Sequence, residues 1–162
     1  MKRIRNKSIL LIDDDAGLLR ALGKVLSGEG AIVTTTDWAG DGIELLSKRD
    51  QHFDLVITDL QMPFVNGLTV VRALHEIFPA LPVVVLTAFA EPEAKAACLE
   101  QGAVAFLEKP LGSQELIAAV QEALRAKTPT RRSSPSAADR SQRVTHPSTS
   151  QARASSSSAA KI

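Results

Sequence analysis

Short apolar runs alternate with longer segments of helical periodicity over the first 126 residues of the chain. After each run, leucine, isoleucine, valine and alanine recur at three- and four-residue spacing, which predicts a helix. The pattern therefore predicts five strands alternating with five helices. The expected strands are residues 8–13, 31–36, 54–59, 82–87 and 103–109, and the expected helices lie around 18–26 and 43–46 and over 67–78, 91–101 and 112–126.

This alternation favours an α/β fold built on a parallel sheet, because parallel strands need a crossover that a helix usually supplies. Right-handed crossovers place helices on both faces of the sheet. The run 82–87 is the most apolar, whereas the β-branched run 31–36 suits a strand nearer an edge. We therefore expect the flavodoxin-like, doubly wound (βα)5 arrangement with strand order 2-1-3-4-5.

Composition divides the chain into two parts. Residues 1–126 carry 12 Lys/Arg and 17 Asp/Glu, whereas residues 127–162 carry 7 and 1, so the formal net charge of +1 hides a basic tail. The tail has ten serines, three prolines and no aromatic residue, and it cannot bury enough apolar surface to offset the entropy of ordering. We expect a single domain over 1–126 and a disordered tail over 127–162, with no DNA-binding domain in either.

Cysteine content and apolar run length predict the compartment. Cys98 is the only cysteine, which excludes an internal disulfide and suits a reducing compartment. The first apolar run ends at Asp13, too early for a signal peptide, and nothing approaches a transmembrane span. A cytoplasmic protein without membrane contact is expected.

Reactive side chains follow four of the five predicted strands. Asp13 and Asp14 come after the first strand, Asp59 after the third, Thr87 after the fourth and Lys109 after the fifth. In an open parallel sheet, ligands bind at the carboxyl ends of the strands. Three carboxylates, a hydroxyl and an ammonium are therefore expected to converge at one edge.

These residue types favour phosphoryl chemistry that depends on a divalent cation. Carboxylates that share a site raise one another's pKa unless a cation compensates them, and Mg²⁺ prefers carboxylates, waters and phosphate oxygens. A lysine neutralises a further anionic group, and a carboxylate can itself be the nucleophile. Asp15, which precedes a predicted helix, is expected to cap that helix instead.

The residues at these strand ends resemble those of response regulator receiver domains. That family carries an acidic pair after the first strand, as in "LLIDDDAG", and D-x-x-M-P-x-x-[DN]-G after the third, as in "DLQMPFVNG". It carries Ser or Thr after the fourth strand, as in "VVVLTA", and Lys-Pro after the fifth, as in "AFLEKPL". The resemblance spans roughly residues 6–126 and departs mildly at Asn66 and Leu111, where the family more often has Asp and Phe.

The resemblance implies a phospho-accepting signalling domain of a two-component system or phosphorelay. Asp59 would accept a phosphoryl group from a sensor histidine kinase or phosphotransfer protein. Asp14 and Asp59 would bind Mg²⁺ directly, Asp13 through water, and the backbone carbonyl of Gln61 would complete the protein ligands. The protein would then catalyse only its own phosphorylation and dephosphorylation, and would not otherwise be an enzyme.

The resemblance also implies how the signal leaves the site. Thr87 and Lys109 would bind phosphoryl oxygens, and Phe106 would be the aromatic switch residue. The surface formed by residues 90–126 would then bind a downstream target protein in a stand-alone receiver, and the Lys109–Pro110 peptide bond would be cis.

Two alternatives remain open from the residues alone. A haloacid-dehalogenase-type phosphatase would use Asp13 and Asp15 as its D-x-D pair, with Thr87 and Lys109 as later motifs, but it leaves Asp59 unexplained. A receiver-like interaction module that is never phosphorylated has no chemical reason to keep all five residues.

Overall fold

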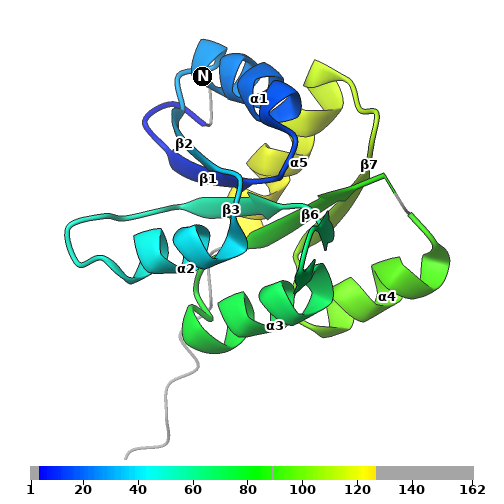
Figure 1. Ribbon diagram of the computed structural model, residues 1–162. Helices are drawn as coiled ribbons and strands as arrows, with labels where there is room; N and C mark the ends of the chain where they lie inside the picture. Colours follow the sequence, from blue (N-terminus) through cyan, green and yellow to red (C-terminus); the bar gives the residue numbers. More distant parts are fainter. Residues whose placement is uncertain (1–3, 89, 127–162) are drawn as a thin grey trace, which may run out of the picture. The chain divides into compact units, whose positions relative to one another are not determined.

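A five-stranded parallel sheet forms the centre of the domain (Figure 1). The computed structural model describes residues 4–88 and 90–126. The strand order β2-β1-β3-β6-β7 is the order 2-1-3-4-5 predicted from the sequence, so that prediction is confirmed. The strands are β1 (Ser8–Ile12), β2 (Ile32–Thr36), β3 (Leu55–Thr58), β6 (Val83–Thr87) and β7 (Ala105–Glu108).

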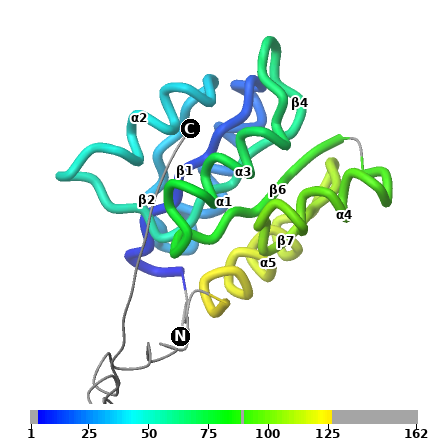
Figure 2. The backbone as a smooth tube through the Cα atoms, turned by 90° about the horizontal axis from the view of Figure 1, so that it is seen from below, coloured from blue at the N-terminus to red at the C-terminus, as the bar shows by residue number. Residues whose placement is uncertain are grey.

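Five helices cover the two faces of this sheet. In Figure 1, α1 and α5 lie on one face, and α2, α3 and α4 lie on the other. Figure 2 shows these last three side by side in the order α2, α3, α4, which follows the order of the strands that precede them. The helices are α1 (Ala16–Gly28), α2 (Ala39–Ser47), α3 (Gly67–Ile77), α4 (Pro92–Glu100) and α5 (Ser113–Ala126).

Alternate strand residues fill two separate cores, one on each face of the sheet. Ile9 and Leu11 point into the core under α1 and α5, whereas Leu10 and Ile12 point into the core under α2, α3 and α4. Strands β1, β3 and β6 are buried almost throughout, which explains their continuous apolar runs. β2 contains only exposed and half-buried residues, as expected of an edge strand.

A small antiparallel hairpin follows β3, in a segment for which the sequence predicted only a loop. It pairs β4 (Gln61–Met62) with β5 (Val65–Asn66) and turns through Pro63 and Phe64. Two-residue strands are too short to give a periodic signal, which is why the pattern of apolar residues did not reveal them.

Three predictions concern matters that this fold does not test. The disordered tail over 127–162 lies outside the described residues and stays a prediction, as does the domain boundary at 126. Among the described helices, none has the length and apolar character needed to cross a membrane. The cytoplasmic location likewise stays a prediction.

Candidate functional site

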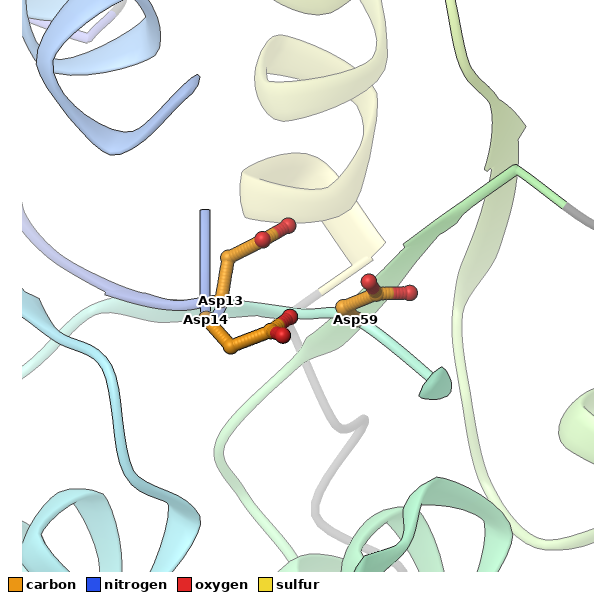
Figure 3. Close-up of side chains that lie close together, drawn as sticks. All are labelled: Asp13, Asp14 and Asp59. Carbon is orange, nitrogen blue, oxygen red and sulfur yellow. The ribbon is translucent and has the colours of Figure 1, made fainter. Parts of the chain in front are cut away.

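Three carboxylates meet where β1 and β3 end (Figure 3). Ile12 lies opposite Thr58 in the parallel register, so the next residues, Asp13 and Asp59, become neighbours across the two strands. The backbone N–H of Asp59 donates to the carbonyl of Ile12 at 3.0 Å and closes the ladder at this point. One carboxylate oxygen each from Asp13, Asp14 and Asp59 lies within 4.8 Å of the others.

The three carboxylates differ in exposure and in hydrogen bonding. Asp13 and Asp59 are buried, with 3% and 5% of their surface exposed, whereas Asp14 is exposed. The Oδ1 of Asp13 accepts the N–H of Asp15 at 2.9 Å, and the Oδ1 of Asp59 accepts the N–H of Gln61 at 3.1 Å. These bonds fix both buried carboxylates in place and leave Asp14 as the carboxylate that solvent ligands reach.

The ammonium of Lys109 bridges the two buried carboxylates. Its Nζ lies 2.6 Å from the Oδ2 of Asp13 and 2.8 Å from the Oδ2 of Asp59. Lys109 follows β7, and its N–H donates to the carbonyl of Thr87 at 2.8 Å, which ties the end of β7 to the end of β6. Its peptide bond to Pro110 is cis, as the resemblance implied.

The charges of the site are not balanced among these residues. Burial raises the pKa of the Asp13 carboxyl, and the hydrogen bonds from Lys109 and from the Asp15 N–H offset this only in part. Burial lowers the pKa of Lys109, but the hydrogen bonds to Asp13 and Asp59 and the attraction of their charges together outweigh burial, so the net shift is upward. Lys109 therefore stays charged, and one ammonium faces three carboxylates.

Asp15 has a structural role that is distinct from the cluster. It is the N-cap of α1, where its Oδ1 accepts the N–H groups of Gly17 at 2.8 Å and Leu18 at 3.0 Å. The hydrogen bond from Leu18 is the main cause of a lowered pKa at Asp15, because it stabilises the ionised form. The prediction that the third aspartate of "DDD" starts a helix is confirmed.

Of the remaining predicted residues, Thr87 and Gln61 lie at the same edge of the sheet, whereas Phe106 lies within a strand. Thr87 is fully buried at the end of β6, and Gln61 begins β4 two residues after Asp59. Phe106 lies in β7 opposite Val85, half-buried against the core under α2, α3 and α4. The structure thus brings the predicted residues other than Phe106 to one edge, and the individual roles of all of them stay predictions.

One structural feature of the site was missed by the sequence analysis. Asn66 is the N-cap of α3, and its Oδ1 accepts the N–H of Leu68 at 3.0 Å. A Cβ at Gly67 would collide with the backbone of Leu60, so only glycine lets α3 start this close to the loop after Asp59. The dipeptide Asn-Gly between apolar residues is a turn signal that could have revealed this junction.

The donor set fits a divalent cation such as Mg²⁺. Carboxylate oxygens converge from two adjacent strand ends, and the exposed Asp14 leaves one side open to water and phosphate oxygens. Mg²⁺ is usually held by one or two carboxylates while keeping several waters, so a three-carboxylate cluster with an open side is a suitable site.

The chain matches the family described as the response regulator receiver domain over residues 9–121. The transcriptional regulatory protein GlrR of Escherichia coli (strain K12) is 36% identical over 121 residues, which are 75% of this chain and 27% of that protein. The DNA-binding transcriptional regulator NtrC of the same strain is 29% identical over 116 residues, which are 72% of this chain and 24% of that protein.

Solved structures agree with this match. A crystal structure of a response regulator receiver domain protein from Clostridium thermocellum superposes with a TM-score of 0.70 at 29% identity, covering 75% of this chain and 96% of that one. A CheY-like response regulator receiver domain protein from Methanospirillum hungatei JF-1 gives a TM-score of 0.70 at 27% identity, with the same coverage of 75% and 96%.

These relatives correct the predicted partners. The sequence predicted a receiver that acts on a downstream protein without a DNA-binding domain, and this prediction is wrong, because the curated relatives are transcriptional regulators and NtrC is named as DNA-binding. The chain spans about a quarter of the length of these relatives. Chemistry at the strand ends does not depend on which output a receiver serves, so those residues could not reveal the output.

The role of Asp15 in the structure contradicts the phosphatase alternative. That alternative needs Asp15 as a catalytic acid, whereas Asp15 caps α1 and points its carboxylate at the backbone of the helix. The fold, the site at the ends of β1 and β3, and the match over residues 9–121 agree with one another. The chain belongs to the response regulator receiver domain family.

Proposed function

We propose that this domain is a phospho-accepting switch in which Asp59 takes a phosphoryl group from a phosphohistidine on a sensor kinase or phosphotransfer protein. The observation that carries the proposal is the ion pair of Asp59 with Lys109 beside two further carboxylates, those of Asp13 and Asp14. Phosphoryl transfer depends mostly on positioning and on neutralising charge, and this cluster supplies groups for both.

The transfer is a displacement at phosphorus. An oxygen of the Asp59 carboxylate forms a bond to phosphorus while the P–N bond of the phosphohistidine breaks, and the electron pair returns to the imidazole nitrogen. The hydrogen bond from the Gln61 N–H to Oδ1 orients the carboxylate, so Oδ2, now bound to Lys109, is the oxygen that attacks. Water later hydrolyses the acyl phosphate and restores the carboxylate.

Asp13, Asp14 and Asp59, with the carbonyl of Gln61, are the residues that would hold Mg²⁺. The cation would neutralise phosphoryl oxygens that the carboxylates otherwise repel. Lys109 leaves Asp59 Oδ2 as that oxygen becomes bonded to phosphorus, and then binds a phosphoryl oxygen. The chemistry acts on the domain's own aspartate, so the domain is proposed as a signalling protein and not as an enzyme with a separate substrate.

Labelling with phosphoramidate tests this proposal, because its P–N bond resembles that of phosphohistidine and no protein donor is needed. With Mg²⁺ present, we expect one phosphoryl group per chain, and borohydride reduction followed by mass spectrometry should place it on Asp59. Asp59→Asn should abolish labelling, and Asp54→Asn, a matched change at the other end of β3, should leave it intact. Absence of labelling in the parent protein would favour the interaction module that is never phosphorylated.

We further propose that Thr87 and Phe106 pass the change to the surface of α4, β7 and α5. Thr87 would turn toward a phosphoryl oxygen, and Phe106, now half-buried, would move into the space beside β6. Thr87→Ala should still accept phosphate, but the amide shifts that beryllofluoride causes in α4, β7 and α5 should shrink. Unchanged shifts in the variant would mean that the signal takes another route.

A further inference from the structure

The turn of the β4–β5 hairpin exposes a large aromatic side chain. Phe64 is 99% exposed. The next most exposed large hydrophobic residue in the described part of the chain, Ile32, is 59% exposed. Isolated apolar residues are common on protein surfaces and need no explanation by themselves. A phenylalanine that exposes its whole side chain, however, gains nothing from burial in this domain.

The backbone of Phe64 makes this exposure more informative. Its φ of 63° is left-handed, a conformation that is rare for a bulky residue and costs stability. Pro63 occupies the first turn position, where its ring fixes a negative φ, so the turn is of the type that requires a positive φ at the second position. Glycine takes that position without strain. Phe64 therefore occupies a position where its side chain strains the backbone of the hairpin and is not buried within the domain.

The hairpin is attached directly to the proposed acceptor. Gln61 begins β4 and donates its N–H to the Oδ1 of Asp59, and Asn66 ends β5 and caps α3. The side chain of Phe64 thus projects from a short, hydrogen-bonded ribbon that starts two residues after Asp59. A protein that brings a phosphohistidine to Asp59 must approach beside this ribbon.

An apolar contact at this edge adds affinity that does not depend on the charge of the site, which Mg²⁺ would change. A phosphohistidine is anionic, and the exposed carboxylate of Asp14 lies at the same edge of the sheet. Burying a phenylalanine side chain supplies affinity that salt does not screen. An apolar recess beside the phosphohistidine would therefore accept Phe64 and add affinity whether or not the site holds Mg²⁺.

We propose that Phe64 is a specificity-determining contact that fits an apolar recess on the phosphodonor protein. This inference rests on the proposed function, since it assigns a role in recognition for the same phosphoryl transfer. The donor is defined by its chemistry, a phosphohistidine on a protein surface with an apolar recess next to it. Small phosphodonors lack that surface and gain nothing from Phe64.

The test compares two donors on three variants. The protein donor is an autophosphorylated histidine kinase core, selected from a panel as the core that labels the parent protein fastest, and the small donor is phosphoramidate. Phe64→Gly removes the side chain and the backbone strain, Phe64→Leu keeps an apolar side chain, and Ile77→Ala removes an exposed apolar side chain at the far end of α3 as a control.

We expect Phe64→Gly to lower kcat/KM for the kinase core by about 10- to 100-fold, the equivalent of burying one phenylalanine, mainly through KM and equally at low and high salt. Phosphoramidate labelling should be unchanged, Phe64→Leu should keep most of the activity, and Ile77→Ala should match the parent. Thermal unfolding of Phe64→Gly should occur at the same or a higher temperature, which excludes misfolding as the cause.

Each other outcome has a distinct meaning. An unchanged kcat/KM for the kinase core with Phe64→Gly would overturn the inference, and so would an equal loss with both donors, because Phe64 would then act on the site itself. A concentration-dependent dimer that Phe64→Gly abolishes would assign the residue to contact between two copies, again against the inference. Failure of phosphoramidate and of every kinase core to label the parent protein would overturn the proposed function instead.

Discussion

Asp54 and Asp59 stand at the two ends of the same strand, β3, and each is a buried carboxylate beside a lysine. At the amino end, a single carboxylate, that of Asp54, accepts Lys7 Nζ at 3.2 Å and the N–H of Ser8 at 3.1 Å, and His52 Nε2 lies 3.8 Å from its Oδ1. At the carboxyl end, Lys109 meets Asp59 at 2.8 Å in a cluster of three carboxylates.

The difference lies in the charge that remains after pairing. At the amino end, a single carboxylate has a lysine and a histidine beside it where the strands begin, and its bonds to Lys7 and Ser8 fasten the start of β1 to the start of β3. The carboxyl end keeps an excess of negative charge at the edge where strands deliver side chains to ligands. A buried carboxylate beside a lysine therefore indicates function only where nearby groups leave its charge uncompensated.

Removing the lysine at each end of β3 should give the largest difference in stability between the two ends. Lys109→Met leaves two buried carboxylates without their ammonium partner. Without Mg²⁺, we expect the free energy of unfolding to fall by about 3 kcal/mol. This is at the low end for a broken buried ion pair, because the Lys109 side chain is 17% exposed. Lys7→Met should cost under about 1 kcal/mol, because the Lys7 side chain is 42% exposed. Urea unfolding followed by circular dichroism measures both values, and similar losses would erase the distinction between the two ends.

Affinity for Mg²⁺ should distinguish the ends next. Asp14→Ala should weaken binding at least about tenfold, or 1.4 kcal/mol, because it removes the exposed carboxylate of the cluster. Asp54→Ala should leave the affinity unchanged, since a single carboxylate that is already paired with Lys7 makes no metal site. Titration followed by the amide shifts of residues in the site measures the affinity. Equal affinities in parent and Asp14→Ala would remove the metal site from this edge.

Replacing aspartate by asparagine should change the free energy of unfolding in opposite directions at the two ends. Asp13→Asn should raise the free energy of unfolding at pH 7 without Mg²⁺ by about 1 kcal/mol, because the raised pKa of Asp13 means that ionising it costs folding stability. Asp54→Asn should lower it by about 1 kcal/mol, because it weakens hydrogen bonds from Lys7 and Ser8.

The pH dependence gives the control for Asp13. A carboxyl with a raised pKa in the folded state favours folding while it is protonated, and this contribution is lost as the pH rises through the folded pKa. The advantage of Asp13→Asn should therefore fade as the pH falls and vanish below the ordinary aspartate value of 3.8. An advantage that persists at low pH would point to packing and not to charge.

The order of strands and helices was predictable because each element carries its own periodic signal. Continuous apolar runs marked β1, β3 and β6, and the weaker pattern of residues 31–36 marked the edge strand β2. The membership of the site followed from the same reasoning, since the ends of parallel strands meet at one edge. The cap role of Asp15 needed only its position before a helix.

The sequence by itself determined the strand order, the edge at which the reactive residues lie, and the residue types that they supply. Tertiary structure alone decided how those charges are paired: Lys109 bridges Asp13 and Asp59, and Asp54 pairs with Lys7. It also decided that Phe64 is fully exposed on a hairpin. Periodicity reports which face of one element is buried, whereas charge pairing depends on distances between residues far apart in the chain, such as 13 and 109. Those distances exist only once the sheet has formed.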